Sequence, residues 1–380
     1  MVSVTFVSSW NSRCGIAVYS KLLVEQLKRL ADVQIIEVSG GSLKFFWKGL
    51  RVAGYGGIVH VQFSLGVFPA LKVCKRIELV DFGAYLFYHG LKLRGIKPVS
   101  TIHEVPDTSV LNGKIGGFYM KRLLNLVFNY SKRLIVLTEK AKADLITAYG
   151  VDAEKIFVIP LGCLENPVTP DKAECKRRLG LEDKTVLLAS GFVSWNHGLD
   201  LAISILPKLP ANVHLVIAGG NRTNDTLKYY QNLKGTINSF GCAGRVCFVE
   251  DYPLPSHVWG AADVAVLPHR VAKECLTLRF HVSYGTPIVA SDIECFKSIN
   301  DMYGCLELFS SGNSFDLYCK LERVLQDSGY RESLGVMGER LRFENRWSVI
   351  AGRHFGVYQA DVGASNSVTA NLRTKKVTKT

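Results

Sequence analysis

The sequence predicts an α/β protein built from two doubly wound domains. Short apolar runs typical of buried parallel strands alternate with segments of helical periodicity along most of the chain. Several of these runs end in a glycine-containing turn, as strand-to-helix connections in such domains do. The alternation stops once, at residues 165–171, and then restarts. A chain of 380 residues is long enough for two such domains.

The first domain is assigned to residues 1–165. Its strands are expected at residues 2–8, 33–38, 57–62, 98–103, 134–137 and 156–159. A helix with apolar residues at positions 16, 19, 22, 23, 27 and 30 follows the first strand. Thr138 and Gly150 are the residue types that begin and end a further helix, at residues 139–149.

The second domain is assigned to residues 166–345. Its strands are expected at residues 185–189, 213–218, 245–249, 265–267, 288–290 and 305–308, and its helices at 199–206, 225–240, 276–284, 315–326 and 330–343. A last helix within residues 346–362 has Trp347, Ile350, Ala351, Phe355 and Tyr358 near one face. Residues 363–380 contain four basic residues and no acid, which predicts a disordered tail.

One strand–loop–helix–strand unit, residues 262–292, has a basic loop in front of its helix. Arg270 and Lys273 lie in this loop, and the helix is expected to start near Leu276. A helix N-terminus presents free N–H groups and the positive end of its dipole, so this place suits a diphosphate. The alternative interpretation is an ordinary crossover in an α/β sheet.

His103 and Glu104 stand at the carboxyl end of a predicted strand, where open α/β sheets bind ligands. They are candidates for a functional site, and a structural role is the alternative.

Positive charge is concentrated in residues 41–133, which hold 14 Lys and Arg residues against four acids. Large apolar side chains are interleaved there, as in Phe45-Phe46-Trp47. This combination favours an anionic membrane surface as a partner. Nucleic acid is the competing partner. The sequence contains no RNA-binding signature, and we expect that the protein does not bind nucleic acid. A solvated basic face above an ordinary core is the third interpretation.

The ten cysteines show no metal-binding spacing and fit reduced thiols in a cytoplasmic protein. We expect no metal, no signal peptide and no membrane-spanning segment.

The order of short motifs resembles the family-4 retaining glycosyltransferases, which have two facing Rossmann-like domains in the GT-B arrangement. The matching pieces begin with Arg13-Cys-Gly-Ile-Ala17, Ile58-Val-His-Val-Gln62 and Thr101-Ile-His103. In the second half they include Val216-Ile-Ala-Gly-Gly220 and Gly285-Thr-Pro-Ile-Val-Ala-Ser-Asp292. Trp347 with Tyr358 resembles the family's last helix, which crosses back to the first domain.

The resemblance implies transfer of a sugar from a nucleotide-sugar with retention of anomeric configuration, to a saccharide or lipid-linked acceptor, at the inner face of the cell membrane. No metal is implied, because helix dipoles and basic side chains neutralise the diphosphate. His103 is the sugar-contacting, catalytic candidate, and Gln62 and Glu104 are placed on the acceptor side. The donor-binding candidates are Arg13, Gly15, Ile16, Ser194, His197, Gly219, Arg270, Lys273, Glu274, Leu276 and Thr277.

The chain departs from the family pattern at several donor positions. Phe192 and His197 stand where the family has Arg and Lys, and neither of its two glutamates is in place, Glu274 being two residues away. Arg13, Arg222, Arg270, Lys273 or a protonated His197 are candidate replacements. The alternative hypothesis is therefore a catalytically degenerate protein that acts as partner or scaffold of an active transferase.

Overall fold

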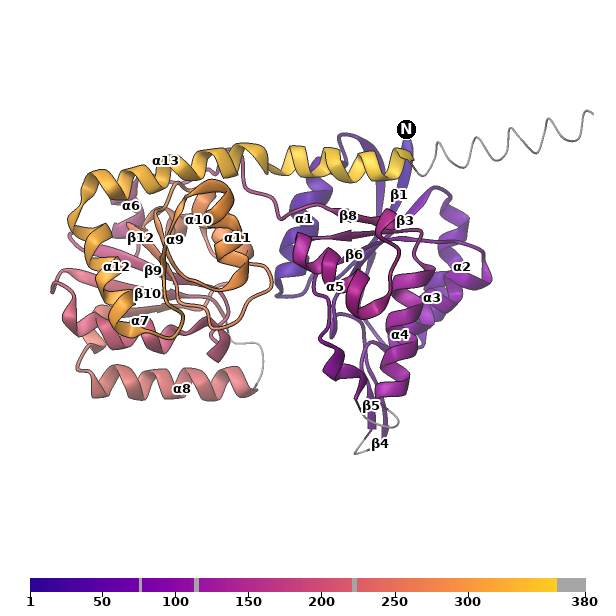
Figure 1. Cartoon of the computed structure of the whole chain (residues 1–380), viewed down its shortest axis with the longest axis horizontal. Helices are drawn as coiled ribbons and strands as arrows, with labels where there is room; N and C mark the ends of the chain where they lie inside the picture. Colours follow the sequence, from indigo (N-terminus) through magenta and orange to yellow (C-terminus); the bar gives the residue numbers. More distant parts are fainter. Residues whose placement is uncertain (75–76, 113–115, 221–223, 361–380) are drawn as a thin grey trace, which may run out of the picture. The chain divides into compact units, whose positions relative to one another are not determined.

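The computed structural model describes residues 1–74, 77–112, 116–220 and 224–360, which form two compact units. Among the described residues, unit 1 comprises Met1–Leu161 and residues 347–360, and unit 2 comprises Gly162–Arg346 (Figure 1). Residues 162–165 group with unit 2 because the Cys163 N–H donates to the Asn345 carbonyl at 2.8 Å. The tail expected at residues 363–380 lies outside the described residues.

Unit 1 is built on a six-stranded parallel sheet with the order β2-β1-β3-β6-β7-β8. The chain order reverses between β1 and β3, which makes the carboxyl ends of these two strands the switch point where ligands bind in such sheets. The strands are β1 (Val2–Ser8), β2 (Ala31–Glu37), β3 (Ile58–Phe63), β6 (Val99–Ile102), β7 (Arg133–Val136) and β8 (Ile156–Val158).

Three helices of unit 1 pack side by side on one face of this sheet. They are α2 (Lys44–Val52), α3 (Phe82–Leu93) and α4 (Gly116–Tyr130), and α3 contacts both of the others (Figure 1). Their apolar sides form one core with alternate residues of the strands, including Val59, Val61 and Phe63. Unit 1 also contains α1 (Gly15–Leu27) and α5 (Glu139–Tyr149). Thr138 and Gly150 cap α5 as predicted.

Helices α2, α3 and α4 and one hairpin of unit 1 were not predicted. The three helices lie within residues 41–133, the stretch that we described only as basic and aromatic. An antiparallel hairpin, β4 (Leu71–Cys74) with β5 (Ile77–Leu79), precedes α3 and projects away from the sheet (Figure 1). The two hairpin strands are short, and strands of three or four residues carry too little periodicity to be recognised.

Unit 2 has a second six-stranded parallel sheet, with the order β11-β10-β9-β12-β13-β14. Its order reverses between β9 and β12, so the switch point of this sheet lies at the carboxyl ends of those strands. The strands are β9 (Thr185–Ser190), β10 (Val213–Ala218), β11 (Val246–Val249), β12 (Val264–Leu267), β13 (Ile288–Ser291) and β14 (Leu306–Phe309).

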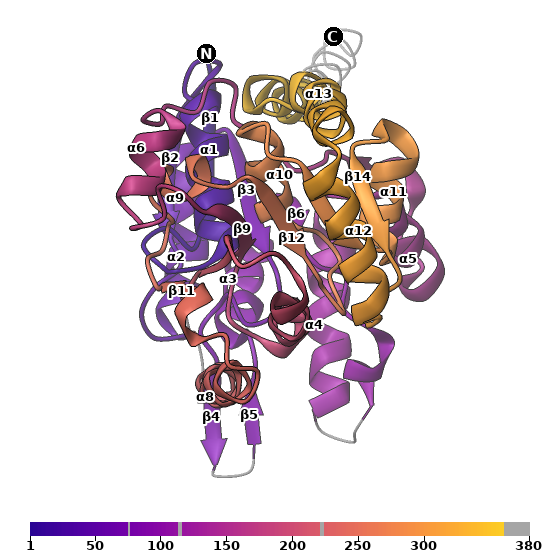
Figure 2. The ribbon, with the colours of Figure 1, turned by 90° about the vertical axis from the view of Figure 1, so that its left-hand side faces the viewer.

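Helices cover both faces of the second sheet, as the predicted α/β class requires. One face carries α7 (Leu199–Ile205), α8 (Asn224–Ser239) and α12 (Ser314–Gln326), and α12 packs on β13 and β14 (Figure 2). Alternate strand residues point to the other face, which carries α9 (Ser256–Gly260), α10 (Leu276–Ser283) and α11 (Glu294–Tyr303). Unit 2 also contains α6 (Lys172–Arg177) and α13 (Ser328–Glu344).

The last described helix, residues 347–360, belongs to unit 1 although it follows α13 of unit 2. It contributes Trp347, Ile350, Ala351 and Tyr358 to the interior, and each of them is at most 3% exposed. The expected return of the chain to the first domain is therefore present.

Candidate functional site

In unit 1, His103 directly follows β6 at the ligand-binding edge of the sheet. Its backbone N–H donates to the Phe63 carbonyl at 2.9 Å, which continues the pairing of β6 with β3 by one residue. Tyr19 of α1 packs edge-on against the His103 ring, with 4.8 Å between the ring centroids. The imidazole is thus fixed between a strand end and the first helix.

Gln62 connects the His103 side chain to a second histidine, His60. The His103 Nε2–H donates to Gln62 Oε1 at 2.7 Å, and Gln62 Nε2 donates to His60 Nε2 at 3.1 Å. The Thr101 hydroxyl also bonds to His60 Nε2, at 2.8 Å. Because an amide oxygen only accepts, His103 carries its proton on Nε2. Its Nδ1 then keeps a lone pair, for which the described residues provide no hydrogen-bond partner.

The helix of residues 347–360 completes this buried chain. His60 Nε2 accepts hydrogen bonds, so its Nδ1–H donates to the Tyr358 hydroxyl, at 2.5 Å. His354 Nδ1–H donates to the Ile350 carbonyl at 3.0 Å, and its Nε2 pairs with the Tyr19 hydroxyl at 3.2 Å. His60, His354 and Tyr358 are each 0% exposed. A hydrogen-bonded path thus runs from the last helix to His103.

His103 is a neutral imidazole at physiological pH. Burial, with a smaller contribution from the neighbouring His354, lowers the pKa of His103 to about 3. Burial also lowers the pKa of His354 to about 4 and that of His60 well below its usual value. A neutral His103 can exchange hydrogen bonds with a sugar hydroxyl, but it cannot supply a positive charge.

The loop between β1 and α1 carries three of the predicted donor residues. The Cys14 thiol caps α1 by accepting from the Ala17 N–H, which leaves Gly15 at the first position of the helix. A Cβ at Gly15 would have no atom within 4 Å, so there is open space beside this backbone. Ile16 is half-buried, whereas Arg13 and Glu104 are exposed.

In unit 2, the turns after β9 and β10 pass so close together that only glycine fits. A Cβ on Gly219 would lie 1.8 Å from the Gly191 carbonyl oxygen, and one on Gly198 would lie 1.9 Å from the Pro268 oxygen. Both glycines have positive φ, of 144° and 62°. These contacts bring the predicted donor residue Gly219 and the loop of residues 191–198 to the switch point of the sheet.

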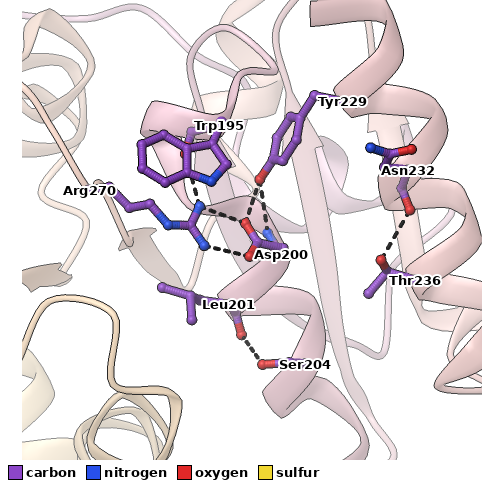
Figure 3. A network of polar contacts seen from close by, with 8 residues as sticks. All are labelled: Trp195, Asp200, Leu201, Ser204, Tyr229, Asn232, Thr236 and Arg270. Carbon is purple, nitrogen blue, oxygen red and sulfur yellow. Dashed lines mark hydrogen bonds and ion pairs between the residues drawn. The ribbon is translucent and has the colours of Figure 1, made fainter.

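Arg270 is held in a clamp with Asp200, as Figure 3 shows. Its two terminal nitrogens bond to the two Asp200 carboxylate oxygens at 2.8 and 2.5 Å, and its Nη1 also donates to the Trp195 carbonyl at 2.9 Å. The guanidinium stacks over the Trp195 ring at 4.8 Å, and the Tyr229 hydroxyl donates to Asp200 at 2.6 Å. Arg270 therefore secures the loop of residues 191–198, and its charge is matched by a carboxylate.

The protonation states of the clamp agree with its geometry. Burial raises the pKa of Asp200, but hydrogen bonds from Arg270 and Tyr229 outweigh burial, and the net shift is downward. The hydrogen bond to Asp200 raises the pKa of Arg270. Both groups are ionised at neutral pH.

His197 does not provide the cation that the family pattern has near this position. Its Nδ1 bonds to the Ser194 hydroxyl at 2.7 Å, and its ring lies 4.5 Å from that of His269. Burial lowers the pKa of His197 to about 4. The proposed protonated His197 is therefore wrong at neutral pH. Arg222, another proposed replacement, lies outside the described residues.

The segment from Lys273 to Thr277 leads into α10. Lys273 is exposed, and Glu274 accepts a hydrogen bond from the Cys275 N–H at 3.2 Å. Burial raises the pKa of Glu274, and the nearby Arg279 charge, which lowers this pKa, only partly offsets the effect of burial. Cys275 is the N-cap, and α10 begins at Leu276 and Thr277 as expected. Arg279 is 4% exposed, and its Nε and Nη1 find no hydrogen-bond partner among the described residues.

Gln62 was placed on the acceptor side, and the structure corrects this assignment. Its side chain is 0% exposed and both ends of its amide are used, by His103 and His60. It is therefore an internal link. Every residue of β3 is buried, as in a parallel strand that is covered on both faces.

Sequence reasoning missed Asp200, Tyr229 and the positioning role of Tyr358. Asp200 and Arg270 are 70 residues apart, and no local signal marks them as partners. Tyr358 was recognised as part of an apolar helix face and of the family's last helix, but not as a hydrogen-bond partner of His60. Among the described residues, there is no group of three or more His, Cys, Asp or Glu side chains that could hold a metal ion. None of the described helices is long and apolar enough to cross a bilayer.

Both halves of the chain match known protein families. Residues 14–163 match Glycosyltransferase Family 4, and residues 171–340 match Glycosyl transferases group 1. A D-inositol 3-phosphate glycosyltransferase of Xylanimonas cellulosilytica is 29% identical over 241 residues, or 60% of this chain and 57% of that protein. A mannosylfructose-phosphate synthase of Agrobacterium fabrum is 31% identical over 179 residues, or 44% of this chain and 39% of that protein. The matched part thus spans about half the length of these curated relatives or less.

Solved structures share the fold of the whole chain. HepE of Anabaena in complex with UDP superposes with a TM-score of 0.75 at 14% identity, covering 95% of this chain and 100% of that one. Sucrose-phosphate synthase of Thermosynechococcus elongatus gives a TM-score of 0.73 at 17% identity, covering 96% and 100%. At these identities the likeness concerns the fold.

Proposed function

The chain is a family-4-like glycosyltransferase with two Rossmann-like domains of the GT-B type, and from this premise we propose that it transfers a sugar from a nucleotide-sugar to a saccharide or lipid-linked acceptor with retention of anomeric configuration. Family matches in both halves support the proposal, as does the presence of a ligand-binding switch point in each sheet. HepE has this fold, and a crystal structure of HepE is in complex with UDP and glucose.

The observation that carries the proposal is the fixed, neutral His103. It stands at a strand end with one nitrogen tied to Gln62 and the other without a partner among the described residues. We assign this imidazole to the transferred sugar, because a neutral nitrogen with a lone pair accepts a hydroxyl proton. Gln62 acts through His103 and is a positioning residue.

The reaction needs one bond exchange at the anomeric carbon. The bond to the diphosphate oxygen breaks, the acceptor oxygen bonds on the same face, and the acceptor proton passes to the departing phosphate. The charge that develops on the diphosphate requires preorganised donors and cations. We assign this role to the start of α10 with Lys273, in unit 2, and we propose that no metal is required.

The test is a thermal-shift screen of the whole protein against UDP-, GDP- and ADP-sugars, followed by product detection with saccharide and lipid-linked acceptors. A ligand present at 100 times its Kd stabilises the bound protein by about 2.7 kcal/mol, which such a screen detects. His103→Ala should abolish product yet retain nucleotide binding, whereas His257→Ala should retain both. Failure of every nucleotide-sugar to bind or react would refute the proposal.

A second candidate function is a non-catalytic partner of an active transferase. It is favoured by the donor side of unit 2, where Arg270 is matched by Asp200, His197 is neutral and Phe192 stacks on Tyr252 at 5.2 Å. This alternative predicts nucleotide binding without product, and no change in product when His103 is replaced in a mixture with the active transferase.

We also propose that the protein works at an anionic membrane surface, on the cytoplasmic side. The support is the basic and aromatic composition of residues 41–133, in which Leu43, Trp47 and Leu93 are each more than 60% exposed. Exposed apolar side chains next to basic ones suit the interface of an anionic bilayer.

A further inference from the structure

Unit 1 contains a cavity of about 650 Å³ between α3 and α4. Its lining runs from Tyr85 to Lys92 on α3 and from Phe118 to Tyr130 on α4. Neither His103 nor any other residue assigned to sugar transfer lines it, so it is separate from the site described above. A volume of this size accommodates a small organic ligand or a lipid headgroup.

The charged side chains in the cavity lining are all positive. Lys92, Lys121 and Arg122 line it, and none of the described residues contributes a carboxylate to the lining. Arg122 stacks over the Phe118 ring at 4.6 Å, and this stacking orients its guanidinium. Guanidinium and ammonium groups converging on one cavity suit a phosphate, which Arg recognises through paired hydrogen bonds.

The remaining lining combines aromatic rings with amides. Tyr85 and His89 pack edge to face at 4.4 Å, and burial together with the Lys92 charge lowers the pKa of His89, so this ring is neutral. Asn125 and Asn129 lie one turn apart on α4 and are joined by a hydrogen bond. Amide and imidazole groups exchange hydrogen bonds with hydroxyls, so the cavity is suited to a phosphate that carries a hydroxylated substituent.

The surroundings of the cavity favour a ligand anchored in a bilayer over a free phosphate. Phe118, in the lining, is 59% exposed, and Leu93, next to Lys92, is 69% exposed. Apolar side chains in such positions are unfavourable in water and gain free energy in the interfacial region of a membrane. They would face the acyl region while the cations hold the headgroup.

We propose that the cavity between α3 and α4 binds the phosphorylated headgroup of an anionic membrane lipid. This inference rests on the proposed membrane contact and assigns it a specific site. The cations hold the phosphate, and the amides and His89 hold its hydroxylated substituent.

The first experiment measures sedimentation of the full chain with vesicles of phosphatidylcholine containing 30% phosphatidylglycerol, against pure phosphatidylcholine. We expect binding only to the anionic vesicles. Lys121→Ala with Arg122→Ala should weaken it about 10- to 30-fold, as expected for two basic residues at an anionic surface. The matched control, Lys28→Ala with Arg29→Ala, removes the same charge from two exposed residues that follow α1. It should change binding less than about threefold, and an equal loss in both pairs would overturn the proposal.

The second experiment blocks the cavity without changing the charge. Asn125 is exposed on α4, so Asn125→Phe fills the cavity and leaves the core of unit 1 intact. We expect at least a fivefold loss of vesicle binding, and unchanged binding would overturn the proposal. Soluble glycerol 3-phosphate tests the anchoring: it should compete only at millimolar concentration, and competition at micromolar concentration would indicate a soluble phosphate ligand instead.

A thermal shift with the nucleotide-sugars serves as the common control for all variants. Loss of vesicle binding with a retained nucleotide-sugar shift supports the lipid site. Absence of wild-type vesicle binding with a retained shift refutes the lipid site and leaves the proposed sugar transfer standing.

Discussion

Gln62 illustrates how one side chain fixes the chemistry of another. An amide has a donor end and an acceptor end, and here His60 takes the first and His103 the second. Reversal of the amide would place two acceptors or two donors against each other. With the amide in this orientation, Gln62 sets the tautomers of both His103 and His60, and the Thr101 and Tyr358 hydroxyls, which can donate or accept, complete the hydrogen bonds of His60.

Replacement of Gln62 by leucine should disturb both histidines. Loss of the amide leaves the His103 Nε2–H unpaired and leaves His60 Nε2 with the Thr101 hydroxyl alone, and a buried unpaired group costs about 1–3 kcal/mol. We expect a lower free energy of unfolding in urea and a loss of the single Nε2–H tautomer of His103 in ¹⁵N NMR spectra. For the proposed reaction, kcat should fall more than the donor KM rises.

Gln34→Leu is the matched control, because Gln34 is an exposed residue of β2. It should leave the His103 tautomer and the free energy of unfolding nearly unchanged. A Gln62→Leu protein with an unaltered His103 spectrum would show that the amide does not position this ring.

Arg270 and Asp200 should behave as one structural unit. If the arginine secures the loop of residues 191–198 through this carboxylate, Arg270→Ala and Asp200→Ala will lower stability by similar amounts. The double variant will then be destabilised by less than the sum of the two single effects. The difference, which is the coupling energy, should be about 1 kcal/mol for a partly exposed bidentate pair. A double-mutant cycle in urea measures this coupling. An Arg270 that served only a ligand would give no coupling, and Asp200→Ala would then be nearly neutral.

At the scale of elements, α2 and α3 approach each other through two glycines. A Cβ on Gly49 would lie 2.4 Å from the Phe87 carbonyl oxygen, and one on Gly90 would lie 2.6 Å from the Phe46 oxygen. Helices that pack this closely have their backbones in contact, and no larger residue fits between them. The packing of α2 therefore depends on the smallest side chain at both positions.

Gly49→Ala should consequently destabilise unit 1 although alanine favours helices. Separating the two helices loosens the core around Phe45 and Phe87, and overpacking of this kind costs about 1–3 kcal/mol. Gly352→Ala, at an exposed helical position with no atom within 4 Å, should instead be neutral or stabilise by up to about 1 kcal/mol. Thermal unfolding of both variants tests the contrast. Equal behaviour would show that α2 can move away from α3 without cost.

The elements that the sequence predicted well are those with strong local signals. The helix Glu139–Tyr149 has both a threonine cap and a terminal glycine, and its bounds are as predicted. The strands of unit 2 are continuous apolar runs because helices cover both faces of their sheet. By contrast, α2 was not predicted from its basic and aromatic sequence. Its buried residues are Phe45, Gly49 and Val52, which form too short an apolar pattern to indicate a helix.

The sequence indicated which candidate residues follow the strands or precede the helices, but it did not indicate the partners of their side chains. His103 was selected as a candidate because it follows a strand at its carboxyl end, and Arg270 because it lies in a basic loop before a helix. The partners of these residues come from distant segments: Tyr358 reaches His60 across 298 residues and Asp200 reaches Arg270 across 70. Such pairs depend on tertiary packing, for which one sequence contains no local pattern.

At the scale of the whole molecule, both units bury neutral histidines. Burial lowers the pKa of each of these side chains below its usual value, and they are His60, His103 and His354 in unit 1 and His197, His269 and His281 in unit 2. An unfolded histidine titrates near 6.5. Below that pH the unfolded chain binds protons that the folded chain does not, so acid favours unfolding.

Stability should therefore be fully present above about pH 6.5 and should fall as the pH decreases toward 4. Asp81 opposes this trend in unit 1, because burial raises its pKa to about 6 and the folded state then binds a proton that the unfolded state does not. Three histidines outweigh one aspartate, which leaves a net loss on the order of 4 kcal/mol for unit 1 between pH 7 and pH 5. Urea unfolding at these two pH values measures the loss. His354→Phe should reduce the number of protons taken up on unfolding, which sets the slope of the unfolding free energy against pH, by about one. A free energy of unfolding that does not change between pH 7 and pH 5 would mean that these histidines are protonated in the folded protein, and the hydrogen-bond polarity that fixes His103 would then be wrong.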